Sequence, residues 1–121
     1  MLLVDDDPDI VQTFRKSLEY NGFIVDVYTS PTMAISEFKT NTYDFVLVDI
    51  SMPDMDGFEF YDKAKEIDSN IKVCFMTAYD VNYQSLQSIF EEPDIEGAYF
   101  KKPFEIKDLV KYLKKELENS G

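Results

Sequence analysis

The sequence contains no histidine and only one cysteine. The lack of histidine excludes Ser-His and Cys-His catalysis, and it excludes metal sites with imidazole ligands. A single cysteine cannot form a disulfide within the chain, and the place of Cys74 in an apolar run predicts a buried, inert thiol in a reducing compartment. Any bound metal must therefore have oxygen ligands, which favours Mg²⁺ or Ca²⁺.

Long hydrophobic runs and an excess of positive charge are also missing. No apolar stretch approaches the roughly 20 residues that a membrane-spanning helix needs, and no basic segment of the signal-peptide type precedes the first apolar residues. The formal net charge is −12. Nucleic acids and anionic membranes repel such a chain, so we expect a cytoplasmic protein that binds neither directly.

The composition suits one compact domain, which we predict to cover residues 1–121. Of these 121 residues, 45% are hydrophobic, enough for a core without disulfides or a structural metal. Apolar segments of strand length alternate with segments of helical periodicity. The predicted strands cover residues 2–4, 23–29, 44–49, 71–77 and 97–101, and the predicted helices cover residues 8–22, 30–41, 57–67, 80–92 and 105–118.

Several residues mark the ends of these helices. Gly22 is expected to end the first helix, and Ser30 is expected to cap the second, with a proline at its first position. Asp56 and Glu59 have the spacing of a capping box at the start of the third helix.

The alternation predicts an α/β fold with the βα unit repeated five times. Continuous apolar strands indicate a parallel sheet covered by helices on both faces, a doubly wound arrangement. Residues 23–29 alternate more than the other strands, which predicts an edge strand. In such sheets ligands bind beyond the carboxyl ends of the strands, where the strand order reverses. Asp49 ends the apolar run "FVLVD" and is therefore expected at the functional edge.

The first predicted strand also ends in acidic residues, in the segment "LLVDDDPDI". Asp7 precedes a proline and is the natural helix cap, and Asp9 lies in the first turn, where the helix dipole favours negative charge. Asp5 and Asp6 remain at the strand end. If the first and third strands are neighbours, these two carboxylates converge with that of Asp49.

Three carboxylates at one place repel each other unless a cation or protons intervene, and Mg²⁺ suits such oxygen ligands. The acidic residues could instead all be helix caps and solvated loop residues. We favour the latter interpretation for four of them, namely Asp7, Asp9, Asp54 and Asp56. For Asp5, Asp6 and Asp49 the shared position at strand ends favours a binding site.

The fourth and fifth predicted strands bring a hydroxyl and ammonium groups to the same edge. The fourth ends in Thr77, and the fifth ends in Lys101 and Lys102. Taken singly, these are usually strand-end or solvated residues. Together with the acids they would serve a phosphoryl group on Asp49, because carboxylates form aspartyl phosphates and phosphoryl transfer needs positioning and charge neutralisation. As an anion, Asp49 needs no general base.

Four motifs follow one another along essentially the whole chain: "LLVDDDPDI", "VDISMPDMDGFE", "FMTA" and "YFKKPF". Each is weak alone, but in this order they are specific, and the sequence resembles a response-regulator receiver domain of two-component signalling, like the bacterial chemotaxis regulator. The resemblance implies a flavodoxin-like fold with a five-stranded sheet in the order 2-1-3-4-5.

The resemblance also implies roles for the residues of the site. Asp49 would be the phosphoacceptor, and Mg²⁺ would be bound by Asp5, Asp6, Asp49 and the backbone carbonyl of Ser51. Other implied roles are phosphoryl binding by Thr77, Ala78 and Lys102, switching by Thr77 and Tyr99, and tuning of dephosphorylation by Ser51 and Tyr79. Lys101 should face the other way, since neighbouring strand residues alternate.

The implied function is regulatory rather than enzymatic. A sensor histidine kinase or phosphotransfer protein would donate a phosphoryl group from phosphohistidine to Asp49 with Mg²⁺ as cofactor. Phosphorylation would alter the surface formed by the fourth helix, fifth strand and fifth helix, which an unknown target would recognise. Residues 78–98 depart from the family pattern, because they form a longer segment interrupted by Pro93. Whether the chain acts alone or within a larger regulator stays open.

Three other classes fit less well. A haloacid-dehalogenase phosphatase needs a second Asp where Ser51 stands. A flavodoxin-like electron carrier needs a hydroxyl- and glycine-rich loop where the sequence has "DDDPD". A purely structural domain requires that the site has lost its function, although all the motif residues are present.

Overall fold

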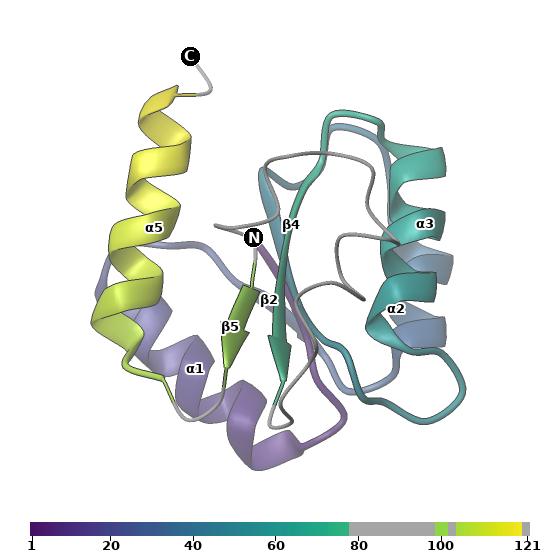
Figure 1. Ribbon diagram of the computed structural model, residues 1–121, viewed down its shortest axis with the longest axis horizontal. Coiled ribbons are helices and arrows are strands. Elements are labelled where there is room, and N and C mark those ends of the chain that lie inside the picture. The colour runs from purple at the N-terminus through teal and green to yellow at the C-terminus, as the bar shows by residue number, and fades with distance from the viewer. Residues whose placement is uncertain (78–98, 102–103, 120–121) are drawn as a thin grey trace.

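The computed structural model describes residues 1–77, 99–101 and 104–119, and for Thr77, Tyr99, Lys101 and Asn119 it describes the backbone alone. Strands and helices alternate along residues 1–77, and a further strand and helix follow in the later described residues (Figure 1). The strands are β1 (Leu2–Val4), β2 (Asp26–Tyr28), β3 (Phe45–Asp49), β4 (Lys72–Thr77) and β5 (Tyr99–Lys101). The helices are α1 (Pro8–Tyr20), α2 (Pro31–Glu37), α3 (Gly57–Ile67) and α5 (Ile106–Asn119).

The five strands form one parallel sheet in the order β2-β1-β3-β4-β5. This confirms the predicted fold and the predicted edge position of β2. The predicted helix over residues 80–92 lies outside the described residues. Strand order reverses between β1 and β3, so the carboxyl ends of these two strands flank the expected ligand position.

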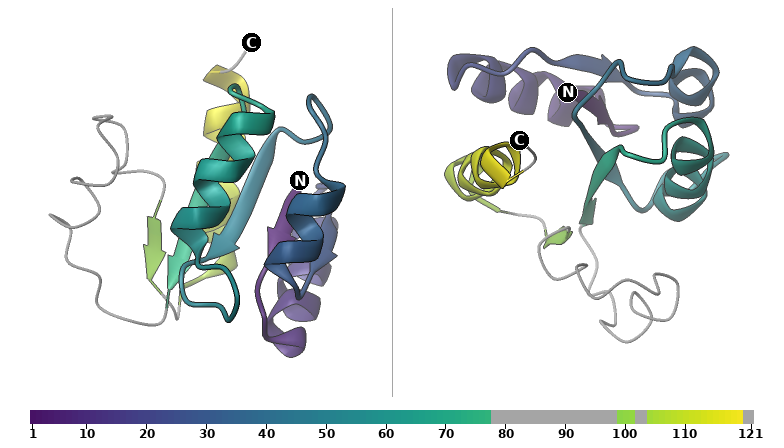
Figure 2. Two further views of the ribbon diagram at one scale, coloured as in Figure 1. Left: turned by 90° about the vertical axis from the view of Figure 1, so that its right-hand side faces the viewer. Right: turned by 90° about the horizontal axis from the view of Figure 1, so that it is seen from above.

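Helices cover both faces of the sheet, as Figure 2 shows from the side and from above. On one face α2 and α3 pack against side chains of alternating strand residues, and on the other face α1 and α5 do the same. The core between the sheet and helices α2 and α3 includes Val46, Val48 and Phe60. The core between the sheet and helices α1 and α5 includes Leu47 and Leu113. Strand side chains alternate between the faces, so apolar strands buried on both sides read as continuous apolar runs.

The predicted caps at the starts of three helices and the predicted end of α1 at Gly22 are confirmed. The side chains of Asp7, Ser30 and Asp56 accept hydrogen bonds from main-chain N–H groups in the first turns of α1, α2 and α3. At the end of α1 the main chain of Gly22 has a φ of 94°, and its N–H donates to the carbonyl of Glu19. A glycine adopts this left-handed conformation without the steric cost that a Cβ brings.

Two predicted elements are shorter than expected. The predicted helix over residues 30–41 stops at Glu37, because Phe38 is extended, with a ψ of 131°, and its side chain is buried in the core. The predicted strand over residues 23–29 begins only at Asp26, because the N–H of Phe23 closes the end of α1 on the carbonyl of Leu18.

Cys74 is buried under α5, and burial raises the pKa of its thiol to about 12. The predicted buried thiol is thus confirmed. At neutral pH the protonated form dominates, and it is a poor nucleophile.

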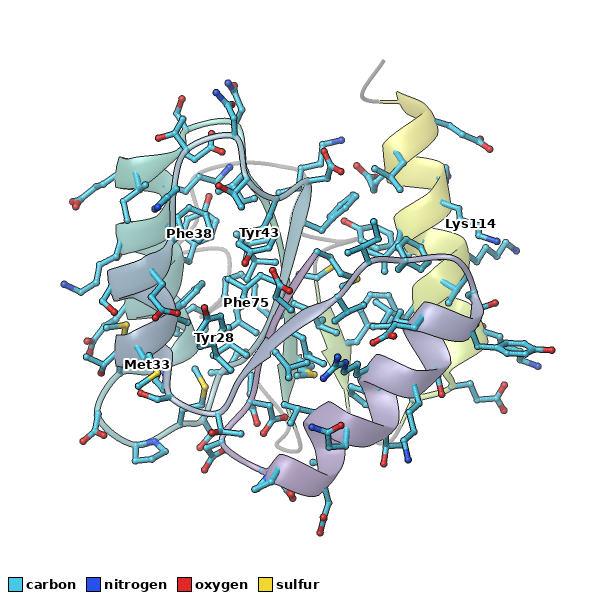
Figure 3. All side chains as sticks on the ribbon, turned by 180° about the vertical axis from the view of Figure 1, so that it is seen from behind. Tyr28, Met33, Phe38, Tyr43, Phe75 and Lys114 are labelled. Carbon is cyan, nitrogen blue, oxygen red and sulfur yellow. The ribbon has the colours of Figure 1, made fainter. Side chains whose placement is uncertain are left out.

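Tyrosines join the edge strand β2 to its neighbours. The hydroxyl of Tyr28 is hydrogen-bonded to the carboxylate of Glu37 in α2, and the hydroxyl of Tyr43 donates to Asp26 over 2.7 Å. Burial and the bond to Asp26 raise the pKa of Tyr43. Figure 3 shows Tyr28, Phe38 and Tyr43 on the α2 side of the sheet, whereas Lys114 projects from α5 on the other side.

The amino-terminal end of the sheet is closed by the buried carboxylate of Asp68, which follows α3. Its oxygens accept hydrogen bonds from the main-chain N–H groups of Asn41, at 3.0 Å, and Asn70, at 3.1 Å. The Thr40 hydroxyl donates to the carbonyl of Ile67 over 2.8 Å. The loop before β3 is thereby attached to the end of α3.

None of the helices described in the structure is long and apolar enough to cross a bilayer.

Candidate phosphorylation site

The carboxyl end of β1 delivers two acidic residues to the edge of the sheet. Asp5 continues the strand, because its N–H donates to the carbonyl of Tyr28 in β2 over 3.2 Å. Its side chain is fully buried, and its Oδ1 accepts a hydrogen bond from the main-chain N–H of Asp7 over 3.0 Å. Asp6 is exposed. Two consecutive acids thus occupy different environments at one strand end.

The carboxyl end of β3 carries the third acidic residue of the site. Asp49 is the last residue of β3 and is only 7% exposed. It lies opposite Met76 of β4, and the next N–H, that of Ile50, donates to the carbonyl of Met76 over 2.9 Å. Pairing with β4 therefore limits the movement of the Asp49 backbone.

The three carboxylates converge. Asp5, Asp6 and Asp49 can each offer an oxygen atom such that all three lie within 4.8 Å of one another. The cause is the register of β1 and β3, in which Val4 pairs with Val48 and the next residue of each strand is an aspartate. The predicted convergence is confirmed, while the roles of the three residues stay predictions.

The other acidic residues of the two loops lie elsewhere in the local structure. Asp7 and Asp56 are helix caps, and Asp9 and Asp54 are exposed. Asp54 has a φ of 69°, within a tight turn in which the N–H of Met55 donates to the carbonyl of Pro53 over 2.8 Å. Their predicted placement as caps and solvated loop residues is confirmed.

Ser51 follows Asp49 at a distance of two residues and is exposed. Its main-chain N–H donates to Oδ1 of Asp49 over 3.1 Å.

Gly57 also shapes this loop, and sequence reasoning assigned it no role. The N–H of Gly57 donates to the carbonyl of Ile50 over 2.9 Å, which returns the chain to the end of β3. The only signal in the sequence is a glycine at the first position of a helix.

The remaining predicted residues belong to β4, β5 and the segments after them. Thr77 is one residue beyond the Asp49 partner Met76, and it pairs with Lys101 of β5. The backbone therefore brings the ends of β3, β4 and β5 to one edge of the sheet. Tyr99 pairs with Phe75, two residues before Thr77. Ala78, Tyr79 and Lys102 lie outside the described residues.

A family model, response regulator receiver domain, matches residues 1–114. The chain belongs to this family. It is 31% identical over 121 residues to the response regulator receiver protein CpdR of Brucella abortus, covering 97% of this chain and 95% of that protein. It is 32% identical, also over 121 residues, to the transcriptional regulatory protein TrcR of Mycobacterium tuberculosis, covering 100% of this chain and 46% of that protein.

Other relatives extend the same pattern. The heme response regulator HssR of Staphylococcus saprophyticus is 36% identical over 93% of this receiver chain and 49% of its own length. The chain thus spans about half the length of HssR and TrcR, but nearly all of CpdR. A solved CheY-like receiver domain from Methanospirillum hungatei has a TM-score of 0.84 and 29% identity, covering 98% of this chain and 92% of that one. This likeness agrees with the flavodoxin-like receiver fold.

Proposed function

We propose that Asp49 is the phosphoacceptor of this receiver domain. The observation that carries the proposal is the convergence of Asp49 with Asp5 and Asp6 within 4.8 Å at the carboxyl ends of adjacent strands. Asp49 belongs to the central strand of the five and is almost completely buried. A carboxylate can act as a nucleophile toward phosphorus and form an aspartyl phosphate.

The donor atoms fit Mg²⁺. All three residues contribute carboxylate oxygens, the ligands that hard divalent cations prefer, and their mutual repulsion favours a cation between them. Asp5, Asp6, Asp49 and the backbone carbonyl of Ser51 would bind it. When bound, Mg²⁺ supplies positive charge that stabilises the developing charge on the phosphoryl oxygens.

In the proposed reaction, an oxygen of Asp49 attacks the phosphorus of a phosphohistidine in line with the bond that breaks. The O–P bond forms, the N–P bond breaks, and its electron pair stays on the imidazole of the donor. The hydrogen bond from Ser51 to Oδ1 orients the attacking carboxylate. The Thr77 hydroxyl, the main chain of Ala78 and the Lys102 ammonium would donate hydrogen bonds to the phosphoryl oxygens.

The phosphoryl group would then alter a surface of the domain. Thr77 would move toward the new oxygens and Tyr99 would pack inward, a local charge change that biases two conformations. Tyr99 lies opposite Phe75 in the pairing of β4 with β5. A movement at Thr77, two residues after Phe75, would therefore reach Tyr99 through directly paired strands. The affected surface comprises residues 80–92, β5 and α5.

The proposed context is two-component signalling in the cytoplasm. The donor would be a sensor histidine kinase or a phosphotransfer protein, and the chain would act on a downstream target or output domain. It would change only its own phosphorylation state, so it is regulatory rather than an enzyme acting on a separate substrate. The net charge of −12 supports the absence of direct binding to nucleic acid or membrane.

Acetyl phosphate with Mg²⁺ tests the proposal without knowledge of the kinase. Intact mass is expected to increase by one phosphoryl group, and fragment masses should assign the group to Asp49. Adding EDTA is expected to prevent the increase. A phosphoryl group located on another residue would contradict the proposal.

A further inference from the structure

We infer that Gly57 is a positioning residue for Asp49, an inference that rests on the proposed function. A Cβ atom added at Gly57 would lie 2.7 Å from the carbonyl oxygen of Asp49 and 2.8 Å from the Cα of Ile50. Both neighbours are main-chain atoms, which cannot rotate away as the end of a side chain can. The first residue of α3 therefore packs directly on the peptide that follows Asp49.

Space, rather than backbone conformation, requires the glycine here. Among the described glycines only Gly22 has a positive φ, so Gly57 lies in a region of φ that any residue can adopt. It is also buried, and its N–H donates to the carbonyl of Ile50 over 2.9 Å. We call this close packing and the hydrogen bond together the Ile50–Gly57 contact. It holds the start of α3 against the end of β3.

The Ile50–Gly57 contact closes the loop that carries the proposed site. On one side the N–H of Ile50 is bonded to the carbonyl of Met76 in β4, and on the other side Gly57 is bonded to Ile50. Between them lies Ser51, whose N–H orients Asp49 and whose carbonyl is a proposed ligand. A methyl group at Gly57 must displace either α3 or the Asp49–Ile50 peptide.

Displacement of that peptide would move the Asp49 carboxylate relative to Asp5 and Asp6. Mg²⁺ demands a near-ideal octahedral arrangement of its ligands, so small shifts of one carboxylate weaken binding. Residues that orient metal ligands typically change metal affinity by about 10–100-fold when mutated. We therefore expect Gly57→Ala to weaken Mg²⁺ binding by about tenfold or more.

The control is Ala64→Gly, a change at a buried position of the same helix that lowers stability without approaching Asp49. Its dissociation constant for Mg²⁺, measured by calorimetry, should remain within about twofold of wild type, because helix stability alone does not move the ligands. Equal affinity of Gly57→Ala and Ala64→Gly would overturn the inference and leave the proposed function intact. If wild type itself bound no Mg²⁺, the proposed metal site and this inference would both fail.

Amide hydrogen exchange of the wild-type protein gives a second test that does not depend on folding of the variant. The Gly57 amide is expected to exchange slowly, and saturating Mg²⁺ should slow it further, because ligand binding stabilises the closed loop. The exposed end of α1, at Tyr20, should show no such slowing beyond the global change in stability. An exchange rate at Gly57 that Mg²⁺ leaves unchanged would contradict the inference.

Discussion

The main-chain N–H of Ser51 donates a hydrogen bond to Oδ1 of Asp49, with 3.1 Å between the nitrogen and the oxygen. The same relationship occurs at the end of β1, where the N–H of Asp7 donates to Oδ1 of Asp5 over 3.0 Å. In each case an aspartate at a strand end is oriented by the main chain two residues later, as in an Asx turn. The carboxylates of Asp5 and Asp49 are thus oriented by the main chain of the loops that follow them.

Asp49→Asn is expected to abolish phosphorylation by acetyl phosphate while the fold persists. Loss of one negative charge relieves repulsion among the converging carboxylates, so the free energy of unfolding should rise by about 1 kcal/mol. Intact mass and urea denaturation measure the two effects. Asp54→Asn is the matched control, since Asp54 lies exposed in the same loop, and this variant should be phosphorylated normally. A phosphorylated Asp49→Asn variant would show that another residue accepts the group.

Mg²⁺ is expected to raise the melting temperature of the unphosphorylated protein. A ligand at ten times its dissociation constant stabilises the folded state by about 1.4 kcal/mol, which corresponds to a shift on the order of 5 °C. Asp6→Asn should reduce the shift, whereas Asp9→Asn, an exposed acid in the first turn of α1, should not. Thermal melts in Mg²⁺ and in EDTA at equal ionic strength check this. The same melting temperature in both buffers would argue against the metal site.

Asp68→Ala is expected to lower the free energy of unfolding by about 2–4 kcal/mol, because two main-chain N–H groups lose a buried carboxyl acceptor. The control is Asp62→Ala, because Asp62 is an exposed acid in α3, the helix that precedes Asp68. This change should alter the free energy of unfolding by less than about 0.5 kcal/mol. Urea denaturation measures both values. Folded Asp68→Ala should still accept a phosphoryl group, since Asp68 lies at the opposite end of the sheet from Asp49. Similar stability of the two variants would mean that the Asp68 hydrogen bonds contribute little.

The sequence predicts slow loss of the phosphoryl group from Asp49. In the receiver family, residues two past the phosphoacceptor and two past the threonine flank the approach of water; here these are Ser51 and Tyr79. Ser51 is small and exposed, and Tyr79, which lies outside the described residues, is bulky and cannot orient a water as a carboxylate or amide can. Tyr79→Ala should therefore accelerate phosphoryl decay several-fold.

The control for Tyr79→Ala is Tyr20→Ala, because Tyr20 is 91% exposed at the end of α1. Decay of the phosphorylated protein, followed by intact mass after removal of acetyl phosphate, should be unchanged in this control. A decay rate in Tyr79→Ala equal to or below that of wild type would reject the role of Tyr79 as a barrier to water.

Much of the fold could be predicted from local patterns. Buried parallel strands are apolar on both sides, so runs such as Phe45–Asp49 are visible without any knowledge of their partners. Helix ends at Asp7, Ser30 and Asp56 were predictable because a cap bonds to main-chain groups only two or three residues away. The end of α2 was not, because Phe38 leaves the helix to enter a core formed by distant residues.

Residue types at short spacing are enough to predict the alternation of strands and helices, the chemistry of the strand ends and the family. The proximity of Asp5 and Asp49 could be predicted only on the condition that their strands are neighbours, because it depends on the parallel pairing of β1 with β3 in a particular register. The need for a glycine at position 57 is likewise tertiary. It arises where the start of α3 contacts the main chain of Asp49 and Ile50, and such a contact leaves no periodic pattern in the sequence.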